Sequence, residues 1–411
     1  MEREEKLQEK REEIKTGGPE RGHDKLEELN KLFVRDRLDL YFDGDEPYFE
    51  TGLFARNQED ELPADGVVTG TGEIDDRLVF FAANDYTVKA GSIGDMHGEK
   101  ILRMQERASE AKRPLLYLID SSGARIDEAA GYHAAKGSAG SLFYNHSRLS
   151  GRVPQIGVLY GPCFAGTAYT PVFCDFTIMV EGMAGMAIAS PRMVKMATGQ
   201  EISIQELGGP EMHAKKSGSI DFVVEDEEEA AEVSKQLLTY LPDSYDEPVE
   251  RQEPQPPETS PGEIDDIIPE HPNAPYDMHD VIDATVDEGS FLEVQKEYAK
   301  ELIVGFGRLD GRTVGVIANQ PKVKGGSIFP KSADKGAEFV WLCDAYNIPL
   351  LYLCDTPGFM VGSSVEEQGI LRRGRKFIFA TSSATVPKMC VVVRKAYGAG
   401  IYAMCGPAYE P

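Results

Sequence analysis

The chain alternates between short, fully apolar segments and stretches with the spacing of amphipathic helices. Three apolar segments have the length and composition of buried strands: PLLYLID (114–120), VPQIGVLY (153–160) and FTIMV (176–180). Residues 99–112 and 193–198 show helical spacing beside them. This alternation predicts an α/β fold with buried strands.

Residues 1 to about 42 are highly charged and have helical spacing, interrupted at Gly17-Gly18-Pro19. The apolar positions after this break lie on one helical face, which predicts a packing or oligomer-contact helix; they are Leu29, Leu32, Phe33, Leu38, Leu40 and Tyr41. The pattern from Gly66 onward predicts a hairpin with Asp75-Asp76 at its tip, and residues 91–98 are expected to form a small-residue loop.

The pattern of the first half recurs in the second half. At an offset of 305 − 70 = 235, Gly70 matches Gly305 and PLLYLID matches PLLYLCD (349–355); near Val153 the offset becomes 386 − 153 = 233. A register held this long indicates an internal duplication. Because 411 − 233 = 178, the second copy lacks a counterpart of roughly residues 179–241, and we expect a fragment or a truncated gene product. Residues 242–275, rich in proline and acid, are expected to form a linker between the copies.

The net charge of −26, from 69 acidic and 43 basic residues, disfavours a nucleic acid partner, which needs a clustered basic face. We hypothesise that this acidic surface reflects adaptation to high salt, where screening removes self-repulsion. Full folding stability in low-salt buffer would count against that hypothesis. The charged start of the chain lacks the apolar core of a secretory signal, and no apolar run has membrane-spanning length, so we expect a cytoplasmic protein.

The six cysteines form no C-x-x-C pair, and the seven histidines show no metal-binding spacing. We therefore expect small buried thiols and no metal held by this chain. The turn Asp355-Thr356-Pro357-Gly358 looks like the D-x-x-G of a GTPase, but the chain has no phosphate-cradling G-x-x-x-x-G-K-[ST] loop. A serine hydrolase is also disfavoured, because no G-x-S-x-G elbow is present.

Two matched turns of small residues remain, at residues 163–167 and 397–401, each after an apolar strand. Small residues let a ligand oxygen approach main-chain N–H groups, and a helix that starts there would add unpaired donors. One such turn could simply allow close packing of a strand and a helix. Two in duplicated domains favour a reaction that must stabilise two oxyanions.

From about Lys25 onward the chain resembles the carboxyltransferase (β) subunit of biotin-dependent acyl-CoA carboxylases of the propionyl-, acetyl- and methylcrotonyl-CoA type. Stretches that carry the resemblance are DGVVTGTGEIDDR, DSSGARIDE, VPQIGVLYGPCFAGTAY, CDAYNIPLLYLCDTPGFMVG, QGILRRG and ATVPKMCVVVRKAYGAGIYAMCG. The resemblance implies two duplicated crotonase-like (ClpP/crotonase) α/β domains, the second one incomplete. It places the N-terminal, acyl-CoA-binding domain at 43–241 and the C-terminal, biotin-side domain at 276–411, after the charged segment 1–42 and around the linker 242–275.

The resemblance also implies a homo-hexamer in which the N-domain of one subunit faces the C-domain of another. Carboxybiotin would come from a separate biotin carboxyl carrier and biotin carboxylase subunit, and a coenzyme A thioester would be the substrate, within a biotin-dependent ligase complex. In such enzymes carboxybiotin is thought to lose CO2, and the biotin enolate then takes the α-proton of the thioester. Carried onto this chain, one oxyanion hole is Ala165 and Gly166, and the other is Ala399 and Gly400. Residues expected to contact substrate are Gly123, Ala124, Arg125, Thr167, Ile401 and Tyr402.

The sequence departs from the family pattern at both turns. The propionyl type usually has two glycines where Ala165 precedes Gly166, and GAGIY (398–402) is closer to the methylcrotonyl type. Ile401 or Tyr402 would shape the acyl pocket, and a bulky Tyr402 favours a short acyl chain.

Three alternatives stay open. The carboxyltransferase subunit of a biotin-dependent, sodium-pumping acyl-CoA decarboxylase would run the half-reaction backwards, and its genes would neighbour membrane pump subunits. A non-catalytic acyl-CoA-binding fragment or scaffold would bind without turnover. A hydratase or isomerase of the same fold could use Asp127 and Glu128, although a solvated face explains these two carboxylates better.

Overall fold

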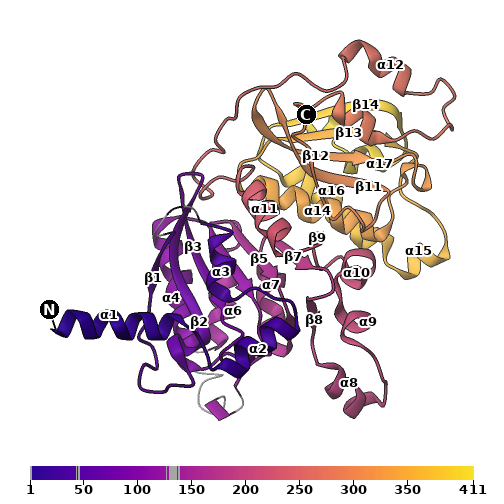
Figure 1. Cartoon of the computed structure of the whole chain (residues 1–411). Coiled ribbons are helices and arrows are strands. Elements are labelled where there is room, and N and C mark those ends of the chain that lie inside the picture. Colours follow the sequence, from indigo (N-terminus) through magenta and orange to yellow (C-terminus); the bar gives the residue numbers. More distant parts are fainter. Residues whose placement is uncertain (1, 43, 45–46, 126, 129–136, 138) are drawn as a thin grey trace. The chain divides into compact units, whose positions relative to one another are not determined.

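The computed structural model describes residues 2–42, 44, 47–125, 127–128, 137 and 139–411. Internal contacts divide the chain into two compact units. The first unit comprises Met1–His213 and Phe222–Leu238, and the second comprises Ala214–Asp221 and Thr239–Pro411. Each unit holds its own β-sheet with helices around it (Figure 1), which confirms the predicted α/β class.

The sheet of the first unit has seven strands in the order β1-β2-β3-β4-β5-β7-β9. Their bounds are β1 Tyr48–Thr51, β2 Val67–Ile74, β3 Arg77–Asn84, β4 Leu115–Ile119, β5 Gln155–Leu159, β7 Phe176–Val180 and β9 Phe222–Val224. The first three strands pair antiparallel, and the strands from β3 onward pair parallel. Every residue of β4, β5 and β7 is buried, as their unbroken apolar sequences predicted. A small parallel pair, β6 (Pro162–Phe164) and β8 (Gly185–Ala187), lies beside this sheet.

The helices of the first unit agree with the pattern of the sequence only in part. The single packing helix predicted from Leu29 to Tyr41 is wrong: Asn30 has a positive φ of 52°, which ends the preceding helix, and Leu29, Leu32 and Phe33 lie outside any helix. They are α1 Glu2–Lys15, α2 Glu20–Glu28, α3 Val34–Asp39, α4 Asp95–Ala111, α6 Ala139–Leu149, α7 Tyr169–Phe173, α8 Pro191–Thr198, α9 Ile204–Gly208, α10 Pro210–Met212 and α11 Glu227–Leu238. The break between α1 and α2 falls at Gly17-Gly18-Pro19 as predicted. Helix α4 starts at Asp95, inside the predicted loop 91–98, because the His97 N–H donates to Asp65 Oδ2 (2.6 Å) and secures the first turn.

The second unit repeats the first in the predicted register. Its strands are β10 Leu292–Val294, β11 Leu302–Leu309, β12 Arg312–Asn319, β13 Leu350–Thr356 and β14 Lys388–Ala396, in that order across a five-stranded sheet. Its helices are α12 Ile264–Ile267, α13 Met278–Asp283, α14 Pro330–Ala345, α15 Ser363–Glu367, α16 Ile370–Ser383 and α17 Gly400–Ala403. The bounds of β11 and β12 are those of β2 and β3 shifted by 235, which confirms the duplication.

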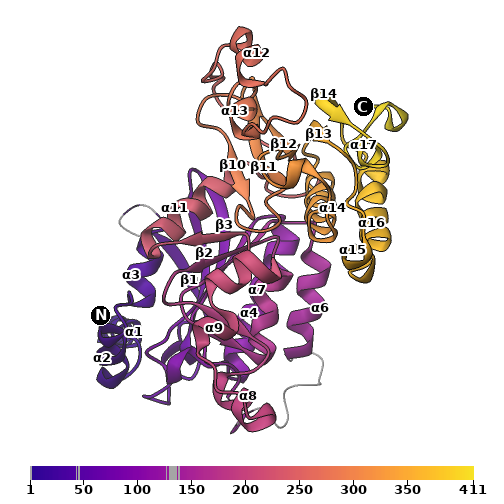
Figure 2. The same cartoon turned by 90° about the vertical axis from the view of Figure 1, so that its right-hand side faces the viewer.

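Both hairpins turn on residues with positive φ, as type I′ turns require. Asp75 and Asp76 have φ of 50° and 62°, and Asp310 and Gly311 have φ of 52° and 74°. The predicted tip of the first hairpin is therefore confirmed. Helices α4 and α6 lie side by side in the first unit (Figure 2), and α14 and α16 form the equivalent pair in the second.

The duplication extends to a buried lysine in each unit. Lys100 donates to the carbonyl oxygen of Ala64 (2.9 Å), and Lys335, 235 positions later, donates to those of Tyr298 (2.8 Å) and Leu302 (2.9 Å). Burial lowers the pKa of each ammonium to about 8. In both copies, main-chain carbonyl oxygens thus accept hydrogen bonds from the ammonium group of a lysine on the buried side of a helix.

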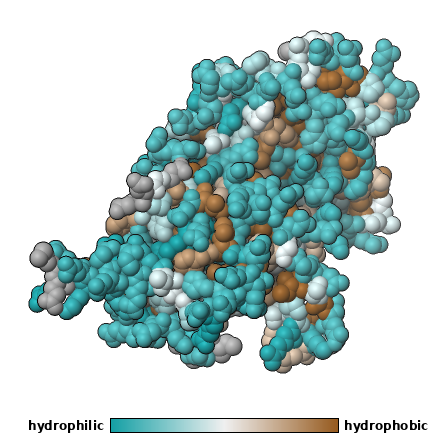
Figure 3. Space-filling model, viewed as in Figure 1, coloured by the Kyte–Doolittle hydropathy of each residue, from teal (hydrophilic) through white to brown (hydrophobic). Residues whose placement is uncertain are grey.

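The surface is largely hydrophilic and most of the cysteines are buried, as the composition and sequence pattern predicted. The face of the molecule shown in Figure 3 is mostly hydrophilic, with hydrophobic atoms over the α8–α9 segment, where Met193 and Met196 are exposed. All six cysteines are free, and four of them are buried (Cys163, Cys343, Cys354 and Cys405). No helix in the described part of the chain is both long and apolar enough to cross a membrane.

Candidate functional site

Three loops that follow the parallel strands β3, β4 and β5 lie together at one edge of the first sheet. The Ser122 N–H donates to Ala90 O (3.0 Å), and the Ile93 N–H donates to Gly123 O (2.9 Å). A Cβ placed on Gly123 would lie 3.8 Å from Phe164 O, so the third loop adjoins the second. Ligands of parallel α/β sheets bind at the carboxyl ends of the strands. This edge is therefore the candidate site of the first unit.

The first predicted turn lies open at this edge. Ala165 and Gly166 are exposed, and the nearest atom to a Cβ placed on Gly166 would be Phe143 Cζ, at 3.8 Å. Thr167 is buried, and its hydroxyl donates to Phe164 O (2.7 Å), which braces the turn from inside. A ligand oxygen can therefore reach the main chain of Ala165 and Gly166 without displacing a side chain.

The backbone of this turn is unusual for an alanine. Ala165 has φ of 57°, a left-handed conformation that costs an L-residue roughly 1–2 kcal/mol. The helices that follow are short: a 3-10 turn over Ala165–Ala168 and then α7 over five residues. The donors of the turn therefore act mainly as individual amides, because a helix this short has only a small dipole.

The second turn has the same backbone as the first, at the predicted offset of 233. Gly398 has φ of 57°, as Ala165 does, and 398 − 165 is the offset of 233. Ala165-Gly166 thus matches Gly398-Ala399, one residue before the predicted pair Ala399-Gly400. Ala399 is exposed, whereas Gly400 is buried and a Cβ on it would lie 2.8 Å from Gly358 Cα.

We expect Gly400→Ala to lower the free energy of unfolding by about 1–3 kcal/mol, because the added methyl group meets backbone that must shift. Thermal denaturation of the purified chain measures the change. Gly262→Ala is the matched control, since no atom of the described residues, its chain neighbours apart, lies within 4 Å of the Cβ that it adds. A Gly400→Ala variant that melts with the parent chain would contradict the close approach of Gly358.

Arg125, predicted to bind substrate, is buried and paired within the first unit. Its guanidinium forms an ion pair with Asp65 and bonds with Ser92 Oγ (3.3 Å) and Glu128 Oε1 (3.4 Å). Arg56 also pairs with Glu128 (3.0 Å). The expectation that Glu128 lies on a solvated face is therefore wrong, because two guanidinium groups hold its carboxylate. Asp65, Asp95 and Glu128 have the proximity of metal ligands, but these arginines already neutralise them.

The other predicted contact residues lie beside the turns. Gly123 has φ of 109° and adjoins the first turn, and Ala124 is exposed next to it. In the second unit Ile401 is half-buried, and a Cβ on Gly406 would lie 2.6 Å from Ile401 Cγ1. Tyr402 is exposed, with its ring centroid 6.1 Å from that of Tyr409.

A buried aspartate supports the loop in each unit. Asp120 directly follows β4, and its carboxylate accepts from Lys31 Nζ (2.8 Å) and lies 3.8 Å from the guanidinium of Arg37. Asp355, its counterpart in β13, accepts from Arg394 (3.1 Å) and from the Tyr276 hydroxyl (2.8 Å). The cations come from unrelated parts of the chain, so each copy neutralises the same carboxylate in its own way.

Two reactive side chains near the first turn are unsuited to acid–base or nucleophilic chemistry. Burial raises the pKa of the Cys163 thiol to about 12, so it is not a thiolate at neutral pH. Burial and the nearby charges of Arg125 and Lys100 lower the pKa of His97 to about 3. Both ring nitrogens of His97 are engaged, by Asn84 and by Asp65 O (3.0 Å each). What the turn offers a ligand is therefore its main chain.

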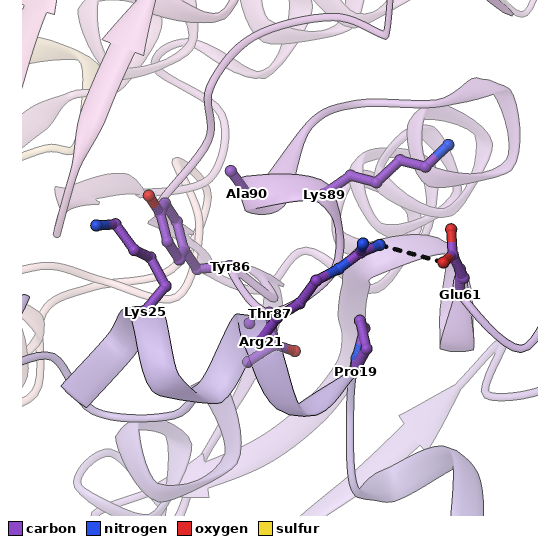
Figure 4. Close-up of a pocket in the computed structure, with 9 residues that line it drawn as sticks. Pro19, Arg21, Lys25, Glu61, Tyr86, Thr87, Lys89 and Ala90 are labelled. Atoms are coloured by element: carbon purple, nitrogen blue, oxygen red, sulfur yellow. Dashed lines mark hydrogen bonds and ion pairs between the residues drawn. The ribbon is translucent and has the colours of Figure 1, made fainter. Parts of the chain in front are cut away.

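A pocket beside these loops was not predicted from the sequence. It is a cavity of about 180 Å³ between α2 and the loop after β3, lined by Pro19, Arg21, Gly22, Lys25, Glu61, Tyr86, Thr87, Lys89 and Ala90 (Figure 4). Arg21 pairs with Glu61 of the lining (3.1 Å), and Lys25 pairs with Glu28 on its own helix (2.6 Å). The two walls meet closely, since the Gly18 N–H donates to Thr87 Oγ1 (2.8 Å). Such a pocket suits an anion with a flat ring, because Tyr86 forms part of its wall.

Comparison with known proteins gives concordant matches. A model of the carboxyl transferase domain matches residues 26–411. An uncharacterized carboxylase of Bacillus subtilis, YngE, is 50% identical over 100% of this chain and 80% of its own. The carboxyltransferase subunit of a propionyl-CoA carboxylase from Haloferax mediterranei is 43% identical over 95% of this chain and 77% of its own. The crystal structure of transcarboxylase 12S, described as a hexamer assembly with methylmalonyl-coenzyme A bound, superposes with a TM-score of 0.94 at 41% identity. That match covers 99% of this chain and 80% of the 12S chain.

Proposed function

Because the chain belongs to the carboxyl transferase family, we propose that it transfers a carboxyl group from carboxybiotin to the α-carbon of a short-chain acyl-CoA, such as propionyl-CoA or acetyl-CoA. The carboxybiotin would be carried by a separate subunit. The observation that carries this proposal is the pair of open main-chain turns at equivalent places in two duplicated units. A transfer between two enolate-like oxyanions needs two sets of preorganised donors.

In this proposal each turn has one task. The main chain of Ala165 and Gly166 holds the thioester oxygen of the acyl-CoA, and the turn at Gly398, Ala399 and Gly400 holds the ureido oxygen of biotin. Biotin supplies the carboxyl group when bound, and the residues of this chain orient the two reactants. Because the amides are fixed by the fold, they need no reorganisation as negative charge develops on the oxygen.

The pocket of Figure 4 would bind the phosphate-bearing end of coenzyme A. Arg21, Lys25 and Lys89 line it in a chain whose net charge is −26. Guanidinium and ammonium groups bind phosphate through charge-assisted hydrogen bonds. The pocket flanks the loop after β3, and the first turn lies at the same edge of the sheet, so one thioester could contact both.

We expect Lys89→Gln to raise KM for the acyl-CoA by about tenfold and to leave kcat nearly unchanged, because a phosphate contact is made equally in ground and transition state. Steady-state kinetics with CoA and dephospho-CoA thioesters would measure the change. Lys324→Gln is the matched control, since Lys324 holds the equivalent position in the second unit (89 + 235). Equal KM values for the parent chain and Lys89→Gln would show that Lys89 does not contact the acyl-CoA.

We further propose a cytoplasmic homo-hexamer that works with a biotin carboxylase and a biotin carboxyl carrier subunit. The hexameric assembly of transcarboxylase 12S, which matches 99% of this chain, supports the oligomer. Light scattering on the purified protein tests it, and a strictly monomeric protein that still turns over would contradict it.

The test of the function is carboxylation of free biotin or biocytin with methylmalonyl-CoA or malonyl-CoA as the donor. The proposed enzyme forms carboxybiotin and releases propionyl-CoA or acetyl-CoA in equal amounts. A non-catalytic acyl-CoA-binding fragment or scaffold would bind the thioester without forming either product. A decarboxylase subunit would catalyse the same half-reaction, so the neighbouring genes, biotin carboxylase or membrane pump, distinguish it from a carboxylase.

A further inference from the structure

Helix α16 carries a cluster of cations that neither turn uses. Arg372, Arg373, Arg375 and Lys376 lie within five residues of one another, in and after the QGILRRG stretch. They belong to a protein with 69 acidic residues and a net charge of −26. A local concentration of positive charge in so acidic a chain favours the binding of an anion at this place.

Only part of this cluster is neutralised by neighbouring carboxylates. Arg373 pairs with Asp334, and Lys376 pairs with Asp334 (3.3 Å) and Glu338 (2.7 Å). Arg372 and Arg375 are exposed, and neither forms an ion pair within the described part of the chain. Two guanidinium groups therefore remain available to a ligand.

The cluster lines a cavity rather than a flat surface. The cavity, about 620 Å³, lies between α14 and α16, and residues 367–369 also line it. Its walls carry the four cations against two carboxylates, Asp334 and Glu367. Trp341 forms part of the α14 wall, with its ring centroid 5.5 Å from Lys376 Nζ. The volume is that of a small-molecule site, and its net charge is positive.

The described residues of the matched helix in the first unit lack this feature. Helix α6 occupies the equivalent place beside α4, and among its 11 residues only Arg148 is a lysine or arginine. The cations of α16 are therefore not required by the duplicated fold. They distinguish the second unit from the first.

We propose that this cavity binds the phosphate group of a small molecule, with Arg372 and Arg375 as its principal ligands. Guanidinium groups form paired hydrogen bonds with phosphate oxygens, and this geometry favours arginine over lysine for such a role. Trp341 offers an aromatic edge to the rest of the ligand. The N-terminal end of α16, a helix of 14 residues, begins at the wall of the cavity and adds a favourable field.

Isothermal titration of the whole chain with pyrophosphate, in a low-salt chloride buffer, tests the proposal. We expect the double variant Arg372→Gln/Arg375→Gln to bind pyrophosphate at least about tenfold more weakly than the parent chain, with an unchanged melting temperature. Arg148→Gln, an exposed arginine on the matched helix α6, should leave the affinity unchanged. Absence of binding by the parent chain, or equal binding by the double variant, would overturn the proposal.

The same variants identify the source of the phosphate. A loss of CoA affinity in the double variant that disappears with dephospho-CoA assigns the 3′-phosphate of coenzyme A to this cavity, in place of the pocket of Figure 4. Equal CoA affinities, with pyrophosphate binding lost, assign it to a separate phosphorylated molecule. Binding is measured without turnover, so this result is independent of whether the chain transfers a carboxyl group.

Discussion

Replacing Gly166 with valine is expected to lower kcat for carboxyl transfer by roughly 10²–10³-fold, the loss that follows when one main-chain oxyanion donor can no longer be used. Among the described residues beyond its chain neighbours, the only atom within 4 Å of a Cβ on Gly166 is Phe143 Cζ, at 3.8 Å, so this part of the fold has room for the larger side chain. Its methyl groups would instead occupy the space that a thioester oxygen must enter. Initial rates of carboxybiotin formation at saturating acyl-CoA measure the effect.

Two neighbouring variants make this experiment specific. Gly166→Ala adds one methyl group and should lose less activity than valine does. Ala165→Gly keeps the main chain and relieves a left-handed alanine, so it should retain activity and unfold no more easily than the parent. A Gly166→Val enzyme with parental kcat and melting temperature would refute the role of the first turn.

The second turn requires a different substitution. Gly400 lies too close to Gly358 Cα to accept a side chain. If a Gly400 variant lost activity, the loss could therefore come from misfolding as well as from a missing oxyanion donor. Ala399 is exposed and corresponds in register to Gly166. Ala399→Val is therefore the informative change at the second turn.

The fold could be predicted largely because the sequence contains it twice. Repeats separated by 235 residues predict which strands are equivalent, and β11 and β12 begin and end where that offset places them. Buried strands were recognisable because β4, β5 and β7 are apolar at nearly every position. Both signals depend on local composition, which a sequence displays directly.

What the sequence could not show depends on long-range contacts. Arg125 looks like a loop cation, yet Asp65, 60 residues earlier, holds it in the interior. The pocket of Figure 4 exists only because Gly18 lets the start of α2 approach Thr87, 69 residues away. The equal positive φ of Ala165 and Gly398 is likewise a property of the folded backbone, because an alanine in the first turn gives no sign of a left-handed conformation. The cations Arg21, Lys25 and Lys89 were visible as residues, but only folding brings them together.

Asp120→Asn is expected to cost about 3–5 kcal/mol of folding stability, the largest loss we foresee for a single substitution outside the turns. The carboxylate is fully buried, and Lys31, whose side chain is only 3% exposed, donates to it at 2.8 Å. Asparagine preserves the shape of the side chain and removes its charge. The ammonium of Lys31 would then lie in the interior without a counter-ion, since Glu227 already pairs with Arg37. Denaturant titration followed by circular dichroism measures the loss.

The same pair offers a check on the cause. Asp127→Asn removes an exposed carboxylate seven residues away and should change stability by less than about 0.5 kcal/mol. Adding Lys31→Met to Asp120→Asn removes the stranded charge and should restore part of the lost stability, because a buried ion pair replaced as a whole is often nearly neutral. A double variant no more stable than Asp120→Asn alone would show that the stranded charge of Lys31 does not cause the loss, and that the carboxylate supports the loop through its hydrogen bonds instead. In that case the hydrogen bonds of Asp120, rather than its charge, would hold the loops at the carboxyl ends of β4 and β5. We would then expect the hydrogen bonds of Asp355 to do the same in the second unit.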